Sequence, residues 1–207
     1  MLEVLDAKVR RMHEALGNLR NEDLSRLKAE DIDIPGFGFY RKLDFGQGQT
    51  PARLSNTASL LVSNIASLKD HLKVWCRKNS KEFKGEQLIN SNRSVALVHD
   101  LWNIDKHVEL DKPPRSGTRP KLQNLNQNLQ LSAGTEANSS VMFQWDPRTG
   151  KMESRVTGDG KAALVIDADV IDENGNKLGT FAALCEAAAT EWENALKAAG
   201  VPVPPRT

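Results

Sequence analysis

Residues 93–107 read RSVALVHDLWNIDKH and hold side chains that could act on a phosphodiester. A histidine titrates near neutral pH and can therefore move a proton. An arginine or lysine can hold a phosphate and stabilise the negative charge that develops on it. An asparagine can orient an imidazole ring or a substrate. Together these residue types favour cleavage of a phosphodiester without a metal or a cofactor.

The same polar side chains share one side of a predicted helix. Each helical residue turns by about 100°, so His99, Asn103 and His107 form a ridge at spacings of four. Apolar residues cover at least half of the circumference. A largely buried helix must still present a polar stripe somewhere, so composition alone favours an explanation of the ridge without chemistry. The polar wedge contains His99, Asn103, Lys106, His107, Asp100 and Arg93.

Asp105 is the residue that fits a purely structural helix least well. It lies at about 240° from His99, inside the apolar arc, where a carboxylate should be paired or hydrogen-bonded. Asn64 and His71 are seven residues apart on the preceding predicted helix, so both lie on one flank of it. We expect a buried contact between Asp105 and one of these two, either structural or part of a binding site.

A basic segment follows this helix. KPPRSGTRPK, residues 112–121, contains no acidic residue and could hold RNA beside a phosphate site. A solvated polar loop is the competing interpretation. Aromatic residues make up only 5% of the chain, so we do not expect a platform of aromatic side chains that stack on the bases of single-stranded nucleic acid. The predicted RNA-contacting side chains are Lys112, Arg115, Arg119 and Lys121.

Bulk composition excludes several classes of protein. The 207 residues carry a formal net charge of +1, so no global field draws the chain to nucleic acid or to a membrane. No apolar run approaches the length of a membrane span. Cys76 and Cys185 both fall in helical patterns and are expected to be buried free thiols, typical of a cytoplasmic protein. The four histidines show no compact metal-binding spacing.

Helices should position these groups. Apolar spacing predicts helices over 2–17 and 51–79, the latter starting at Thr50-Pro51, with a second helical stretch at 21–30. The 93–107 segment belongs to a predicted helix over 88–109, and a last helix is predicted over 179–199, ending at Gly200. The tail, residues 201–207, is expected to be extended or loose.

Strands should fill the rest of the chain. Residues 31–51 are rich in glycine and aromatic residues, which indicates a strand pair or a long loop. Residues 120–175 alternate and contain turns, which predicts an antiparallel β-meander of about four strands. The sequence thus predicts a single α+β domain over 1–200, with a helical core at about 1–110 and 178–200.

Three short elements resemble a known family. Arg93-x5-His99 resembles the loose Arg-x4–6-His signature of the HEPN superfamily of helical bundles, many of them metal-independent ribonucleases. LWNIDKH, 101–107, resembles the L-x-N-I-D-K-H element of bacterial proteins with HEPN-like helices. SLKDHL, 67–72, resembles an ALDHL-like element that those proteins carry on an earlier helix. The resemblance covers about residues 50–110.

The resemblance implies a fold, a function and a set of roles. It implies a HEPN-like bundle of about four helices with the β-meander inserted before the last helix, and a homodimer. Arg93 would grip the scissile phosphate, and His99 would transfer the proton of the ribose 2′-hydroxyl. The expected function is RNA cleavage or RNA binding of the toxin or phage-defence type; the alternative is a non-catalytic helical interaction module. Supporting site residues would be His71, Asn103, Asp105, Lys106 and His107.

Overall fold

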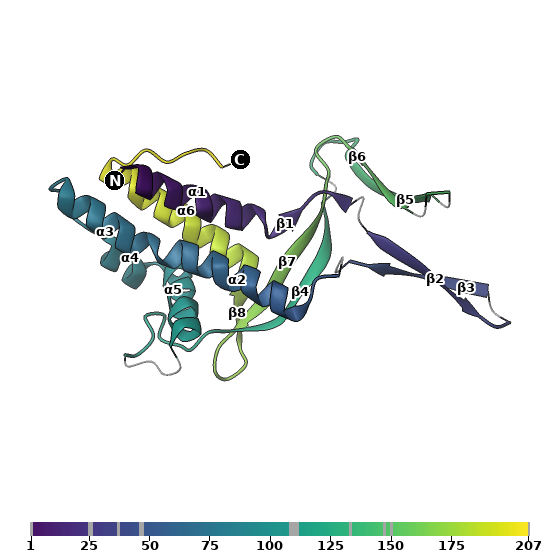
Figure 1. The fold of residues 1–207 in the computed structure, drawn as a ribbon, viewed down its shortest axis with the longest axis horizontal. Coiled ribbons are helices and arrows are strands. Elements are labelled where there is room, and N and C mark those ends of the chain that lie inside the picture. The colour runs from purple at the N-terminus through teal and green to yellow at the C-terminus, as the bar shows by residue number, and fades with distance from the viewer. Residues whose placement is uncertain are drawn as a thin grey trace. The chain divides into compact units, whose positions relative to one another are not determined.

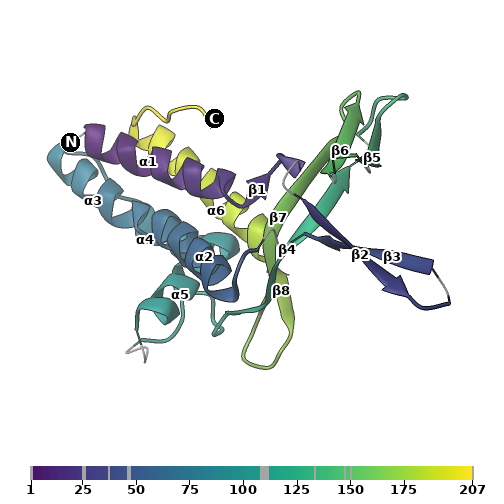
Figure 2. The same cartoon turned by 45° about the vertical axis from the view of Figure 1, so that its right-hand side comes forward.

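The structure is a computed structural model of residues 1–207, and Figures 1 and 2 show its ribbon from two sides. The chain divides into two compact units. Unit 1 comprises residues 1–19, 55–125 and 167–207, and unit 2 comprises residues 20–54 and 126–166. The described residues are 2–24, 27–36, 38–45, 48–107, 112–132, 134–146, 148–149 and 151–206.

Unit 1 is built mainly from helices. The helices α1, α3 and α6 pack against one another and lie side by side in both ribbon views, and α5 packs on α6 and α4 (Figures 1 and 2). The buried side chains of these helices are mostly aliphatic and include the rings of Trp75, Phe181 and Trp192. The helices are α1 (Leu2–Gly17), α2 (Pro51–Ala66, from residue 55 in this unit), α3 (Leu68–Lys78), α4 (Gly85–Ser91), α5 (Arg93–Lys106) and α6 (Phe181–Ala199).

Two predicted long helices are each divided in two. The first breaks at Ser67, whose hydroxyl donates to the carbonyl oxygen of Ser63, so a local side-chain bond competes with the helical ladder. The second breaks at Asn92, which has extended backbone angles and accepts a bond from the Val95 N–H at 3.1 Å. Asn92 is thus an N-cap, and α5 begins at Arg93.

The last helix ends as predicted, but the tail behaves differently. Gly200 has a φ of 85°, and the next residue's N–H, that of Val201, bonds the carbonyl of Leu196 at 2.9 Å, as in a Schellman cap. The tail is predicted to be extended or loose; its described residues, 201–206, form no helix or strand but are attached to α6. Val201 is buried, and the Arg206 guanidinium donates to Glu193 of α6 at 2.8 Å.

Unit 2 contains two hairpins and a small core. The strands β2 (Lys28–Ile34) and β3 (Gly38–Asp44) pair in antiparallel fashion, which confirms a strand pair after residue 31. The strands β5 (Ser140–Asp146) and β6 (Lys151–Thr157) form the second hairpin. The core consists of Leu24, Leu27, Ala162 and Leu164, with Phe45, Leu129, Val141 and Phe143 packed against it.

Two long strands run through both units. β4 (Lys121–Ser132) and β7 (Lys161–Ile171) pair with each other in a sheet of order β1-β7-β4, in which β1 is Arg20–Asn21. β8 (Lys177–Thr180) joins β7 by a tight turn. β4 therefore pairs with β7, although β5 and β6 come between them in the sequence and form a separate sheet.

The predicted fold, a four-helix HEPN-like bundle with one inserted meander, is wrong. The described residues form six helices, and strands β1, β2 and β3 separate α1 from α2. The strands that follow α5 belong to two sheets, so they do not form one meander. The described residues of 21–30 do not form an α-helix, because Leu24 and Leu27 pack in the core of unit 2 and β2 begins at Lys28. No described helix is long and apolar enough to cross a membrane.

Candidate functional site

Helix α5 is buried around most of its circumference. All seven residues from Val95 to Leu101 are buried, including His99 at 6% exposed. The side-chain amide of Asn103 forms a hydrogen bond with His99 Nδ1 at 3.0 Å. The predicted ridge is real for these two residues, and its effect is to fix the imidazole in place. In the described structure Nε2 is buried without a hydrogen-bond partner.

The structure does not bring the predicted catalytic pair together. Arg93 is the exposed first residue of α5, whereas His99 lies within the buried stretch, and no hydrogen bond joins them in the described part of the chain. His107 follows the last helical residue, so the ridge ends before it. Lys106 lies over the Trp102 ring, 5.0 Å from its centroid, where a cation–π contact occupies it.

Asp100 is the functional group on α5 that the sequence pattern did not single out. Its carboxylate is 1% exposed and accepts the backbone N–H groups of Arg115, at 3.0 Å, and of Ser116, at 2.7 Å. Burial by itself raises the pKa of the Asp100 carboxyl. The neighbouring His99 and the Ser116 and Arg115 donors more than offset burial, so this pKa is below its ordinary value.

The bonds to Asp100 hold the described part of the basic segment against α5. The Arg115 guanidinium donates to Asn90 at 2.8 Å and to Glu86 at 3.1 Å, so its charge is already neutralised. Glu173 accepts the Arg119 N–H at 2.9 Å and the hydroxyl of Thr118. The segment is thus an anchored loop, and the side chains left for a ligand are those of Lys112, Arg119 and Lys121. No pattern in the sequence indicated the burial of Asp100, because helical spacing places it in the polar wedge.

Asp105 is exposed, and the prediction that it is buried is wrong. The expected contact with Asn64 or His71 is absent among the described side chains, because Asn64 accepts a bond from Lys8 of α1 at 2.9 Å. Asp105 instead lines a cavity of about 230 Å³ between α2, α5 and the first residues of β4, where Lys121 also lies. The acid that the fold buries on α5 is Asp100, which lies on the other side of the helix from Asp105.

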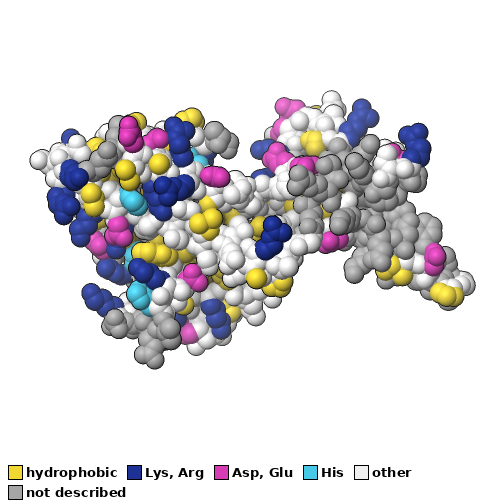
Figure 3. All heavy atoms as spheres, viewed as in Figure 1, with side chains coloured by type: hydrophobic (Ala, Val, Ile, Leu, Met, Phe, Trp, Pro, Cys, Tyr) yellow, Lys and Arg dark blue, Asp and Glu magenta, His cyan; other side chains and the backbone are white. Residues whose placement is uncertain are grey.

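A cation cluster, defined as Lys8, Arg11 and His71, lies where α1 packs on α3. The half-buried Lys8 has a lowered pKa, first because of burial and then because of Arg11. The pKa of His71 is lowered by burial and by both cations, while Asp70 opposes the shift in part. Figure 3 shows Lys and Arg side chains frequent over α1 and α3. His71 is the one member of this cluster that the sequence predicted as a site residue.

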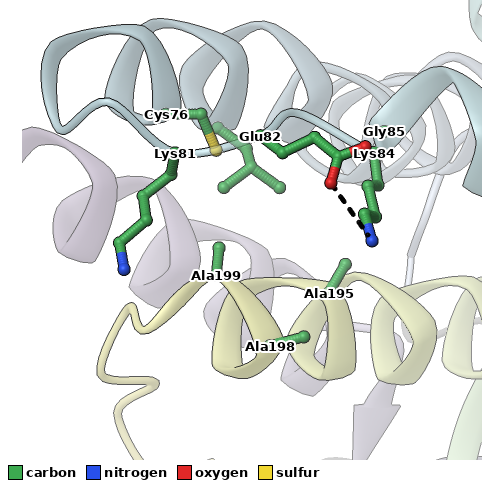
Figure 4. A pocket seen from close by; sticks show the side chains of 9 residues that line it. Cys76, Lys81, Glu82, Lys84, Gly85, Ala195, Ala198 and Ala199 are labelled. Carbon is green, nitrogen blue, oxygen red and sulfur yellow. Dashed lines mark ion pairs between the residues drawn. The ribbon is translucent and has the colours of Figure 1, made fainter.

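A second cavity, of about 300 Å³, lies between the end of α3, the segment before α4 and the last turns of α6 (Figure 4). Cys76 forms part of its roof, and Ala195 and Ala199 point into it from α6 (Figure 4). At its rim the Lys84 ammonium pairs with Glu82 at 3.3 Å. Cys76 is buried, which raises the pKa of its thiol, so this cavity lacks a reactive nucleophile.

Metal ligands are not clustered in the described residues, since no three His, Cys, Asp or Glu side chains lie close enough to share an ion. Comparisons with protein-family models, with curated proteins and with solved structures find no match to the chain.

Proposed function

We propose that the chain is an RNA-binding protein whose cation cluster on α1 and α3 holds a backbone phosphate. The observation that carries the proposal is the closeness of Lys8, Arg11 and His71, with Asp70 as the acid that acts on His71. After burial, which is the larger cause, Arg11 lowers the pKa of Lys8, and Lys8 and Arg11 lower the pKa of His71, so these charges repel in the free protein. A phosphate bound among them would remove that repulsion.

Neighbouring cations on the same helix differ from the cluster. Arg10 pairs with Asp6 at 2.8 Å, one helical turn away, and so carries a neutralised charge. No described carboxylate forms an ion pair with Lys8 or Arg11. Asn64, which is 6% exposed, fixes the Lys8 ammonium through its side-chain oxygen. A charge that is fixed and unneutralised loses little entropy when it meets an anion, which suits phosphate binding.

RNA is the polyanion we propose because residues 50–110 resemble HEPN proteins. The proposal is limited to binding: the geometry offers no route by which a substrate would reach the imidazole of His99, which is 6% exposed. The cytoplasm, where RNA is available and thiols such as the free Cys76 and Cys185 stay reduced, is the proposed location. The homodimer implied by the resemblance remains a prediction.

The test is fluorescence anisotropy of a labelled single-stranded RNA at two salt concentrations. Lys8→Gln and Arg11→Gln should each weaken binding about fivefold to tenfold and reduce the salt dependence by about one phosphate contact. Arg10→Gln is the matched control and should change affinity less than twofold, about the effect of one exposed pair. Single-stranded DNA of the same sequence shows whether the site distinguishes RNA from DNA.

His71 gives this proposal a pH signature. Lys8 and Arg11 on α1 and Asp70 on α3 are the charged groups that act on it. A phosphate would raise the depressed pKa of His71, so binding takes up a proton and RNA affinity should rise as the pH falls from 8 to 6. His71→Gln should flatten that dependence. Equal affinities for Lys8→Gln and Arg10→Gln, or no binding by the folded wild type, would refute the proposal.

A further inference from the structure

The cavity that contains Asp105 has one wall from each of three elements of unit 1. Helix α2 contributes Ala58 and Val62, α5 contributes Leu101 and Ile104, and β4 begins at its edge. Its volume of about 230 Å³ is below the range of about 300–1,000 Å³ that is usual for drug-sized ligands, so a ligand of this cavity must be small. The lining is mostly aliphatic, so a ligand would place an apolar group against it.

Two opposite charges stand at the mouth of this apolar cavity. Asp105 projects from the last turn of α5 and Lys121 is the first residue of β4, and both line the cavity. They form no ion pair with each other or with another described residue. The two charges come from different elements of unit 1, α5 and β4, so a ligand between these elements would contact both.

The electrostatic surroundings of Asp105 and of Lys121 favour different ligand groups at the two ends of the cavity. Asp105 lies in the last turn of α5, where the carbonyl groups of the helix end already carry partial negative charge. A carboxylate is unfavourable there unless a cation is added, so this end favours an ammonium group. Lys121 favours a carboxylate at the other end, and the hydroxyls of Ser55 and Ser59 on α2 can bond either group.

We propose that this cavity binds a small zwitterion, an amino acid with an apolar side chain of about the size of leucine. The ammonium group of the ligand pairs with Asp105, its carboxylate pairs with Lys121, and its side chain lies on Val62, Leu101 and Ile104. Because both charged groups are exposed in the free protein, the affinity should be modest, in the high-micromolar to millimolar range. This site is independent of the proposed RNA-binding function.

The experiment is isothermal titration calorimetry on the full chain with leucine and two truncated analogues. 4-Methylpentanoate lacks the ammonium group, and 3-methylbutylamine lacks the carboxylate. Leucine should bind saturably, and each analogue should bind at least about tenfold more weakly, because each leaves one charge at the mouth unpaired. Asp105→Asn should weaken the binding of leucine and of 3-methylbutylamine and leave the binding of 4-methylpentanoate unchanged. Lys121→Gln should weaken the binding of leucine and of 4-methylpentanoate and leave the binding of 3-methylbutylamine unchanged.

Lys106→Gln is the matched control, since Lys106 is next to Asp105 in sequence but lies over Trp102. It should leave leucine binding unchanged, as should Lys8→Gln, which removes a member of the cation cluster. Three results would overturn the inference: no saturable binding of leucine to the folded wild type, equal binding of both analogues and leucine, or wild-type affinity in both Asp105→Asn and Lys121→Gln.

Discussion

Replacing Asp100 by asparagine should weaken the attachment of the anchored loop to α5. The carboxylate accepts two backbone N–H groups, from Arg115 and Ser116, and an asparagine side chain has a single oxygen to offer them. The second N–H would then face an NH₂ group inside the protein. Losing a charge-assisted hydrogen bond and leaving a buried donor unpaired should together cost about 2–4 kcal/mol of the free energy of unfolding.

The assay is urea denaturation of wild type and Asp100→Asn, with amide hydrogen exchange of Arg115 and Ser116 as a local measurement. Asp105→Asn is the control, because it removes the same charge from an exposed position of the same helix. That variant should stay within about 0.5 kcal/mol of the wild type. In Asp100→Asn, the Arg115 and Ser116 amides should exchange faster even under conditions in which the helices stay folded.

The effect of Asp100 should depend on pH in a defined direction. Its folded-state pKa is below its ordinary value of 3.8, so the carboxylate stabilises the fold above that value. This contribution is lost as the pH falls through the folded-state pKa. The difference between wild type and Asp100→Asn should therefore be full at neutral pH and shrink in strong acid. Equal stabilities of Asp100→Asn and Asp105→Asn at neutral pH would refute the anchoring role.

Two further predictions concern α6. Arg206→Gln removes a charged hydrogen bond to Glu193 and should lower the free energy of unfolding by about 1–2 kcal/mol, measured by urea denaturation. Because Arg206 helps to hold the pKa of Glu193 below its ordinary value, the variant should also lose less stability on acidification than the wild type, and a steeper loss would contradict this. Burial raises the pKa of the Cys185 thiol, so a disulfide reagent at pH 8 should label Cys185 only after unfolding; rapid labelling of the native chain would show that the thiol is accessible.

Local sequence signals predicted the elements that local physics controls. The helices over 2–17 and 179–199 follow from apolar spacing, and the start at Pro51 follows from Thr50, whose hydroxyl accepts the Arg53 N–H. Gly200 adopts a positive φ that a glycine adopts readily, so the end of α6 is visible in the sequence. The bond between Asn103 and His99 was also predictable, since helical residues four apart are neighbours.

Tertiary structure decided which of these side chains are free to act. Helical periodicity gave Asp105 a buried position and Asp100 a solvated one, but the loop that returns over α5 covers Asp100 and leaves Asp105 at an open cavity. No periodicity could place Lys8 beside His71, because they are brought together by the packing of α1 on α3. The sequence by itself determined the local elements and the residue types that could do chemistry. Only the fold, through burial and long-range contacts, determined which charges are neutralised inside the protein and which remain available for a ligand.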